Sequence, residues 1–372
     1  MRWRILKIIL SGGGTGGHIY PALTIADQLK KLQPNAEIIF VGTKQGLEKN
    51  IIPRYGYILK FIDVAGFNRS FGFETFRSAG KLFIGIYDAR HILSEVKPDL
   101  VIGTGGYVCA PVVFMAALKN IPTCIQEQNA FPGVTNKILS RYVKKVFLGY
   151  QEAARYLPAK TAVEYIGNPV REEILAKKKE IAIAELGLDP GKKTILVSGG
   201  SRGAKSINRA MLDVEMVLSG RHDVQVLHIT GDVHYEKYIK EIGKRSHLAA
   251  NIIIQPYLHN MPDALAVADL AIFRSGAIGL AELTARGIPS VLVPYPYATD
   301  NHQEFNARAI EAKGAAKVIL DRDLNGSRIL EIVEHLLLHN DELQKMQKAA
   351  KDLGRPRAAE IIARHALELV TK

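Results

Sequence analysis

Residues 8–13 read IILSGG, and the pattern returns at residues 195–200 as ILVSGG. Each stretch is an apolar run of strand length that ends in glycines, and each leads into a segment of helical periodicity. A strand, a glycine-rich turn and a helix in this order form the first unit of a Rossmann-like domain. The sequence therefore predicts two such domains.

Further apolar runs of strand length alternate with helical segments such as residues 22–32. These runs lie at residues 37–41, 100–103, 123–126, 224–229, 251–255, 270–273 and 290–293. The alternation predicts an α/β fold with mostly parallel strands. We expect the two sheets to face each other across a cleft, at the carboxyl ends of their strands, where open α/β sheets bind ligands.

The length of the chain and its breaks in pattern place the domain boundary. At 372 residues the chain exceeds what one hydrophobic core usually serves. Gly167 and Pro169 interrupt the pattern, and a lysine-rich stretch at residues 177–179 leads to the second repeat. We expect an N-terminal domain over residues 1–166, which the C-terminal helix 355–372 joins, and a C-terminal domain over residues 167–354.

The composition, with 47% hydrophobic and 23% charged residues, is that of a folded globular protein. The longest apolar run, residues 107–118, is too short to span a membrane and the N-terminus lacks a secretory signal, so we expect an intracellular protein. Cys109 and Cys124 have no metal-ligand spacing. The net charge of +12 suits a polyanionic partner, but without zinc-finger spacing or an RNP-like strand we do not expect nucleic acid.

Small residues gather in turns between a strand and a helix. These turns lie at residues 12–18, 103–107, 199–204 and 274–282. Glycine lets backbone N–H groups approach a ligand closely, and the helix N-terminus that follows favours negative charge. One such turn is a weak signal, whereas several in one chain indicate phosphate binding.

The first of these turns resembles two common nucleotide-binding motifs. It almost spells a P-loop, but His18 and Ile19 stand where that motif needs Lys and Ser/Thr. It also matches the dinucleotide pattern G-x-G-x-x-G, yet the acidic residue that binds ribose is missing where the second strand ends. Lys44 at that place leaves an NADP-binding alternative open.

His18 stands at the head of the first predicted helix. The positive end of the helix dipole disfavours the charged imidazolium, and a neutral imidazole can act as a base. Packing against the turn is the alternative role for this side chain.

Short motifs elsewhere in the chain occur in a family-specific order. They are SGGGTGGH at residues 11–18, GGY at 105–107, EQN at 127–129, GNPVR at 167–171, GGS at 199–201 and RSGA at 274–277, followed by Glu282. Together they closely resemble the MurG family of glycosyltransferases over essentially the whole chain. The resemblance implies a GT-B fold and inverting transfer of N-acetylglucosamine from UDP-N-acetylglucosamine to lipid I, which forms lipid II in peptidoglycan synthesis. It also implies peripheral attachment to the cytoplasmic face of the cell membrane.

Alternatives to this reaction remain open. A related GT-B enzyme would glycosylate another lipid acceptor, such as diacylglycerol. A non-catalytic regulator would bind the nucleotide sugar without turnover.

The resemblance assigns the donor mainly to the second domain. Arg171, Ser201 and Leu258 would lie near the nucleotide, and Glu282 would accept from the ribose hydroxyls. Gln303 would bind the sugar. The ribose and diphosphate would lie against Ala277, Ile278, Gly279, Leu280 and Ala281.

The resemblance assigns the acceptor side and the chemistry to the first domain. Thr15, Gly16 and Gly17 would face the donor sugar and the acceptor diphosphate, with Asn129 and Tyr107 as further substrate-binding residues. Inverting transfer needs a base to take the proton of the acceptor hydroxyl. His18 is the favoured candidate and Glu127 the competing one, and the sequence does not separate them.

No metal or other cofactor is expected. The helix dipoles and Arg171 would offset the charge of the leaving group. Asp321 and Asp323 form an Asp-x-Asp pattern, which we interpret as loop and cap chemistry rather than as a metal site.

Aromatic and basic residues mix in the stretch from residue 67 to residue 83. Phe71, Phe73, Phe76, Arg77 and Lys81 are predicted to bind an anionic membrane surface, because aromatic rings enter the headgroup region while cations contact lipid phosphates. Arg141, Lys144 and Lys145 would extend this surface. The alternative is a helix whose rings belong to the core.

Overall fold

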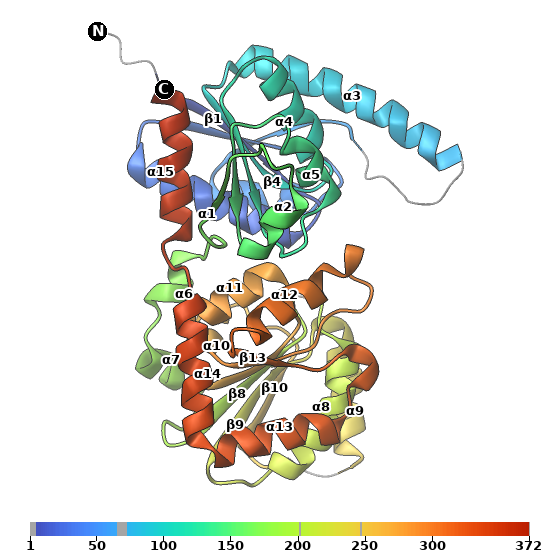
Figure 1. Ribbon diagram of the computed structural model, residues 1–372. Coiled ribbons are helices and arrows are strands. Elements are labelled where there is room, and N and C mark those ends of the chain that lie inside the picture. The colour runs from blue at the N-terminus through green and yellow to red at the C-terminus, as the bar shows by residue number, and fades with distance from the viewer. Residues whose placement is uncertain (1–4, 65–72, 201, 246–247, 372) are drawn as a thin grey trace. The chain divides into compact units, whose positions relative to one another are not determined.

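The computed structural model describes residues 5–64, 73–200, 202–245 and 248–371, and for residues 73–82 and 371 only the backbone. The chain divides into two compact units, residues 1–169 with 357–372, and residues 170–356. Each unit holds a parallel sheet with helices on both faces (Figure 1). The predicted pair of Rossmann-like domains is thereby confirmed.

The sheet of the first unit has the strand order β3-β2-β1-β4-β5-β6-β7. Its strands are β1 (Lys7–Gly12), β2 (Glu37–Gly42), β3 (Ile58–Phe61), β4 (Leu100–Gly105), β5 (Thr123–Glu127), β6 (Lys145–Leu148) and β7 (Val163–Tyr165). Its helices are α1 (Gly16–Leu32), α2 (Glu48–Ile51), α3 (Phe73–Val96), α4 (Cys109–Leu118), α5 (Val134–Leu139) and α15 (Ala358–Thr371), with 3-10 turns at Ile52–Tyr55 and Gln151–Tyr156. The chain order reverses between β1 and β4, so the turns that follow these two strands meet at the switch point where such sheets bind ligands.

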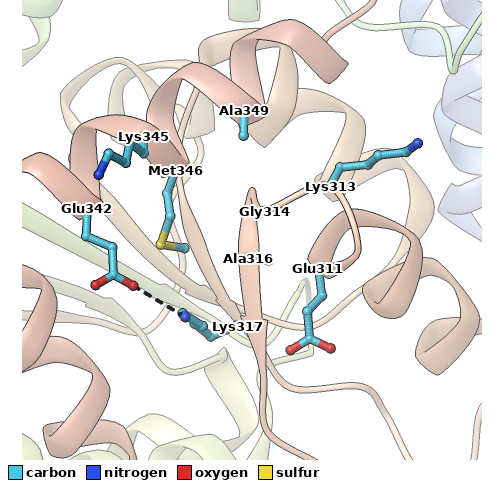
Figure 2. A pocket seen from close by; sticks show the side chains of 9 residues that line it. All are labelled: Glu311, Lys313, Gly314, Ala316, Lys317, Glu342, Lys345, Met346 and Ala349. Carbon is cyan, nitrogen blue, oxygen red and sulfur yellow. Dashed lines mark ion pairs between the residues drawn. The ribbon is translucent and has the colours of Figure 1, made fainter.

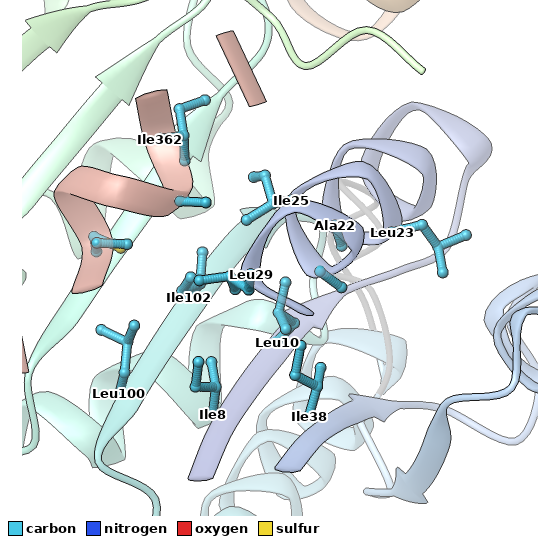
Figure 3. Close-up of a cluster of buried hydrophobic side chains, with 14 of the residues drawn as sticks. Ile8, Leu10, Ala22, Leu23, Ile25, Leu29, Ile38, Leu100, Ile102 and Ile362 are labelled. Atoms are coloured by element: carbon cyan, nitrogen blue, oxygen red, sulfur yellow. The ribbon is translucent and has the colours of Figure 1, made fainter. Parts of the chain in front are cut away.

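Alternation along β1 divides the core of the first unit between the two faces of the sheet. Ile8 and Leu10 point to one face, where they pack with Leu29 of α1 and Ile362 of α15 (Figure 3). Ile9 points to the other face and packs with residues of α3 and α4. Because successive side chains of a strand face opposite sides, a strand covered by helices on both faces is apolar throughout.

The second unit repeats the plan with the strand order β10-β9-β8-β11-β12-β13. Its strands are β8 (Lys193–Ser198), β9 (Val224–Ile229), β10 (Ile252–Gln255), β11 (Leu270–Phe273), β12 (Ser290–Leu292) and β13 (Ala316–Val318). Its helices are α6 (Glu172–Ala176), α7 (Lys179–Leu186), α8 (Lys205–Leu218), α9 (Asp232–Gly243), α10 (Met261–Val267), α11 (Ala277–Arg286), α12 (His302–Glu311), α13 (Gly326–Leu338) and α14 (Asn340–Leu353), with 3-10 turns at Thr299–Asn301 and Asp321–Asp323. The switch point lies between β8 and β11, and the glycine-rich turns at residues 199–204 and 274–282 follow these two strands.

Candidate functional site

The first glycine-rich turn meets the turn after β4 at the switch point of the first unit. Gly105 and Gly106 both have positive φ, at 98° and 81°. A Cβ atom on Gly105 would lie 2.9 Å from Nδ1 of His18, and one on Gly106 would collide with the carbonyl oxygen of Gly13. Only glycine fits at both positions, because each needs the left-handed conformation and a close approach.

His18 lies in the first turn of α1, and its surroundings determine which ring nitrogen carries the proton. Nδ1 is 3.0 Å from the carbonyl oxygen of Thr104 and 3.0 Å from Oε1 of Gln128. Both atoms are acceptors, so the neutral ring donates from Nδ1–H. Nε2 is then the nitrogen with the lone pair, which is the form that a general base needs.

Gln128 was not among the predicted site residues, although it stands between two of them in the EQN motif. Its side chain is 2% exposed. Its Nε2 donates to the carbonyl oxygens of Thr104, at 2.7 Å, and Gln126, at 3.0 Å. These acceptors fix the orientation of the amide, and Oε1 therefore faces His18.

Glu127, the competing candidate base, is 1% exposed and fully used as an acceptor. Its Oε1 accepts from the backbone N–H and from Nδ2 of Asn129, at 2.9 and 3.2 Å. Its Oε2 accepts from the backbone N–H of Gly133 and from Nδ2 of Asn136, at 3.1 and 2.8 Å. These N–H donors occupy the lone pairs that a base would use. The arrangement suits a residue that holds the loop after β5 in place.

The other predicted residues of the first unit lie at the same edge of the sheet. Thr15 is the N-cap residue of α1 and is exposed, as is Gly17. Gly16 begins the helix between them, and Asn129 follows β5. The ring of Tyr107 covers Gly14, whose Cβ would lie 3.2 Å from the ring. The structure thus brings the predicted residues of this unit together around the ends of β1, β4 and β5.

In the second unit, Arg171 and Glu282 contact each other. Nε of Arg171 donates to Oε1 of Glu282 at 3.1 Å, and its NH2 group lies 3.0 Å from the same oxygen. Glu282 is 7% exposed, and burial raises the pKa of its carboxyl above the ordinary value, while the charge of Arg171 acts in the opposite direction. A buried carboxylate beside a guanidinium is an acceptor suited to a pair of hydroxyl groups.

The predicted diphosphate segment forms the start of α11. Gly276 is the N-cap residue, and the helix begins at Ala277, directly after the turn that follows β11. The residues 278–281 complete the first turn and lead to Glu282. Unpaired N–H groups and the dipole make such a helix start suitable for an anion.

The remaining donor residues lie on other loops of this unit. Gln303 lies near the start of α12, and its Oε1 accepts from the backbone N–H of Tyr295 at 3.0 Å. Leu258 is half-buried in the loop after β10. Ser201 lies outside the described residues.

Asp321 of the Asp-x-Asp pattern lies in a 3-10 turn and has two partners. Its Oδ1 is 2.6 Å from NH1 of Arg274 and accepts from Oγ of Ser206 at 2.6 Å. The carboxylate therefore links this turn to the residue that follows β11 and to α8. In the described part of the chain, no group of three His, Cys, Asp or Glu side chains is placed to hold a metal ion.

A cavity of about 510 Å³ lies elsewhere in the second unit, between α12, β13 and α14 (Figure 2). Its lining carries both signs of charge, and Lys317 pairs with Glu342 at 3.4 Å. It is lined by Glu311, Lys313, Gly314, Ala316, Lys317, Glu342, Lys345, Met346 and Ala349. None of these is a predicted site residue.

The predicted membrane-binding residues fall mostly outside what the structure describes. Phe71 lies outside the described residues, and Phe73, Phe76, Arg77 and Lys81 lie in α3 without described side chains. Across residues 5–64, 73–200, 202–245 and 248–371, no helix is long and apolar enough to cross a membrane.

Exposed apolar side chains nevertheless lie on α3 and α5 of the first unit, and exposed basic side chains lie in the segment after α5. Phe83 and Tyr87 of α3 are 73% and 71% exposed. Ile138 of α5 and Tyr142 just after it are exposed too, beside the exposed Arg141. Helix α4 packs against both α3 and α5. Lys144 is exposed as well, but Lys145 pairs with Glu164 at 2.9 Å.

Family models match both halves of the chain. The glycosyltransferase family 28 N-terminal domain matches residues 8–148, and the glycosyltransferase family 28 C-terminal domain matches residues 194–362.

Individual relatives match nearly the whole chain. A protein of Thermoanaerobacter sp. (strain X514) named UDP-N-acetylglucosamine--N-acetylmuramyl-(pentapeptide) pyrophosphoryl-undecaprenol N-acetylglucosamine transferase is 47% identical, over 96% of this chain and 98% of its own length. The protein of the same name from Bacillus subtilis (strain 168) is 46% identical, over 95% of this chain and 97% of its own. The crystal structure of Acinetobacter baumannii MurG is 28% identical and superposes with a TM-score of 0.78, covering 98% of this chain and 99% of that one.

Proposed function

Since this chain belongs to glycosyltransferase family 28, we propose that it transfers N-acetylglucosamine from UDP-N-acetylglucosamine to the lipid-linked acceptor undecaprenyl-pyrophosphoryl-N-acetylmuramyl-pentapeptide. The observation that carries this proposal is the match, along nearly the whole chain, to relatives that are named for this transfer. The product is lipid II, the disaccharide-carrying precursor of peptidoglycan, and the second product is UDP.

The reaction inverts the configuration at C1 of the transferred sugar. The hydroxyl oxygen of the acceptor attacks C1 from the face opposite to UDP, the bond between C1 and the diphosphate oxygen breaks, and the hydroxyl proton goes to a base. We assign the base to Nε2 of His18. Two acceptors at Nδ1 support this assignment, because they leave the lone pair on Nε2.

Glu127 has a different role in this proposal. Its carboxylate already accepts from Asn129, Gly133 and Asn136. We therefore propose that it fixes the loop that carries Asn129, a substrate-binding residue, and does not take the proton. Thr15, Gly16, Gly17 and Tyr107 complete the acceptor side of the first unit.

The second unit holds the donor in this proposal. Glu282 accepts from the ribose hydroxyls. Arg171, whose charge opposes the effect of burial on the pKa of that carboxyl, lies beside the nucleotide, with Leu258 and Ser201 as further contacts. The start of α11 carries the diphosphate, where N–H groups and the helix dipole stabilise the charge that grows on UDP as it leaves. Gln303 binds the sugar hydroxyls.

We also propose that the first unit binds an anionic membrane surface, at the cytoplasmic face of the membrane where a lipid-linked acceptor is presented. Exposed Phe83 and Tyr87 of α3, Ile138 of α5 and Tyr142 support this, since α3 and α5 both pack against α4 and Tyr142 follows the exposed Arg141 in the chain. Apolar side chains that enter the headgroup region and cations that contact lipid phosphates act together at such surfaces. Phe71, Phe73, Phe76, Arg77 and Lys81 would extend it along the chain.

Purified protein tests the reaction directly. We expect UDP-N-acetylglucosamine and a lipid I analogue to give the disaccharide product, detected by mass spectrometry together with released UDP. Product from UDP-glucose and diacylglycerol, but none from the first pair, would assign the chain to a different lipid acceptor. Tight UDP binding without turnover of either pair would make it a nucleotide-sugar-binding protein instead.

A further inference from the structure

Glu48 is a completely buried carboxylate in the first unit, at 0% exposure. It begins the short helix α2, which follows β2, and the transfer reaction does not use it. A charged side chain taken out of water is unfavourable unless hydrogen bonds replace its hydration. The partners of this carboxylate therefore indicate why it is there.

These partners are all donors, and one of them belongs to the first glycine-rich turn. Oε1 of Glu48 accepts from the backbone N–H and from the hydroxyl of Thr43, at 2.9 and 2.8 Å. Oε2 accepts from the backbone N–H of Gly14 at 3.0 Å. One carboxylate thus joins the loop after β2 to the turn that leads into α1.

Glycines around the carboxylate make room for it. A Cβ atom on Gly13 would lie 2.7 Å from Oε1 of Glu48, and one on Gly42 would lie 2.5 Å from its Cγ. A Cβ on Gly46 would collide with the same carboxylate. Gly13 is therefore needed for close packing on Glu48, in addition to any contact that the turn makes with substrate.

Gly14 is held from both sides. Glu48 binds its N–H group, and the ring of Tyr107 lies 3.2 Å from where its Cβ would be. Its φ is 84°, a conformation that glycine adopts easily and also leaves easily. A turn made of such residues keeps one shape only if its surroundings impose it, and a hydrogen bond to a charged acceptor is a strong constraint.

We propose that Glu48 is a positioning residue for the sugar transfer: its carboxylate fixes the turn at Gly14 and so aims the start of α1, with His18, at the acceptor. This role rests on the proposed function, because the transfer is the reaction that needs His18 in one place. Small displacements of a positioned base cost large factors in rate.

The substitution Glu48→Gln tests this role with little change in shape. An amide can accept at only one of its two ends, so its NH2 group must face the N–H of either Gly14 or Thr43. We expect kcat for the lipid I analogue to fall by about a hundredfold. The affinity for UDP, measured by calorimetry, stays unchanged because the donor residues lie in the second unit.

NMR on ¹⁵N-labelled protein measures the hydrogen bond of the Gly14 amide directly. In the wild type the Gly14 amide should resonate downfield and exchange slowly with solvent, because its proton is bound to a carboxylate. In Glu48→Gln the signal should shift upfield and exchange faster. A purely structural role would lower the melting temperature and would not separate kcat from UDP affinity.

Two further variants serve as controls. Thr43→Val removes one donor to Glu48, and with it the acceptor of the Gly46 N–H, but keeps the bond between Glu48 and Gly14. It should therefore lower kcat less than Glu48→Gln and leave the Gly14 signal downfield. It also tests the proposal if Glu48→Gln does not fold. Glu95→Gln removes an exposed carboxylate of the same unit, paired with Lys60 at 2.7 Å, and should leave kcat unchanged.

Two results for Glu48→Gln would overturn the positioning role. The first is a shifted Gly14 signal with wild-type kcat, because the turn would then have changed without effect on the reaction. The second is an unshifted Gly14 signal, because Glu48 would then not hold the turn. A wild-type protein without transfer activity would refute the proposed function instead. The Gly14 signal would then still report whether Glu48 holds the turn.

Discussion

The hydrogen-bond partners of a side chain determine whether it can act as a base in this protein. His18 and Glu127 are both residue types that can serve as bases, and they lie at the same edge of one sheet. Nδ1 of His18 faces oxygen acceptors, which leave Nε2 basic. The oxygens of Glu127 face N–H donors, which occupy its lone pairs.

The substitution His18→Asn should separate the two functions of the imidazole. The asparagine amide can replace Nδ1–H as a donor to the carbonyl oxygen of Thr104, but it offers no base in place of Nε2. We expect kcat to fall by about a hundred- to ten-thousandfold with UDP affinity unchanged. His91→Asn, an exposed histidine of α3, is the control. Near wild-type kcat in His18→Asn would assign the proton transfer to another group.

A second prediction at this scale concerns pH and Glu282. Burial raises the pKa of this carboxyl above 4.5, so it takes up its proton at a higher pH than an exposed glutamate does. The protonated form fits the folded state better, and its contribution to stability is lost as the pH rises through the raised pKa. UDP binding in the proposed donor site has the opposite requirement, because there the ribose hydroxyls donate to the charged carboxylate.

We therefore expect UDP affinity to fall as the pH is lowered through the raised pKa of Glu282, beginning above pH 4.5. Calorimetric titrations across this range measure it. Glu282→Gln should bind UDP more weakly and lose the pH step. Glu173→Gln removes the exposed glutamate that contacts the same Arg171, at 2.8 Å, and should keep the step. A step that persists in Glu282→Gln would belong to a different group.

Sequence reasoning locates His18 because the residues that define it are neighbours in the chain. The turn, the helix start and the missing P-loop lysine can all be read from residues 12–19. Gln128 approaches the ring from 110 residues away, and Glu48 reaches Gly14 from 34 residues away. No local sequence pattern around Gln128 or Glu48 predicts such a contact. Their roles therefore become visible only in the folded structure.

Among the elements, α15 has an unusual position: it is formed by the end of the chain but packs in the first unit. It contacts α1 and β4, and it buries Ile362, Ala363 and Ala366 against the core there. Small residues at positions 363 and 366 let the helix approach closely. The first unit is therefore complete only when this helix is in place.

The substitution Ile362→Ala should destabilise the first unit. Ile362 is fully buried, and removing its side chain beyond Cβ leaves a cavity that costs about 2–5 kcal/mol of unfolding free energy. Urea denaturation followed by circular dichroism measures this. Ile361→Ala changes a partly buried residue of the same type next to it and should cost less. Equal losses would mean that α15 does not pack through Ile362.

Strand prediction succeeds for most of the inner strands and for the edge strand β10, and it fails for the inner strand β6 and for the other edge strands. The apolar runs at residues 224–229 and 270–273 coincide with β9 and β11. The sequence does not reveal β6, an inner strand of only four residues that begins with a lysine, or β3, β7 and β13, which are short edge strands with partly exposed residues. An edge strand needs no continuous apolar run, because one of its sides faces solvent.

The whole molecule carries a formal net charge of +12. Such a charge attracts anionic surfaces over distances set by the ionic strength, about 10 Å in 0.1 M salt. Long-range attraction of this kind is not specific, and the exposed apolar side chains of the first unit would decide which face of the protein makes contact.

Binding to vesicles should depend both on the net charge and on the exposed apolar side chains. We expect sedimentation with vesicles rich in phosphatidylglycerol to exceed that with phosphatidylcholine vesicles and to decrease as salt is added. The double substitution Ile138→Ser and Tyr142→Ser should weaken binding without altering UDP affinity. Val233→Ser, at an exposed position of the second unit, is the control. Equal vesicle binding by the double variant would place the contact on another surface.

The return of α15 to the first unit also affects the order in which the protein can be made. A ribosome delivers the chain from its N-terminus, at about 5–20 residues per second, so folding usually begins before synthesis ends. Residues 170–356 form one continuous unit and can close as soon as they have emerged. In the first unit, the part of the sheet face that lies beside α1 stays uncovered until residues 357–372 have been synthesised. The half that starts first is thus the half that finishes last, and its exposed face is where a chaperone would be needed during synthesis.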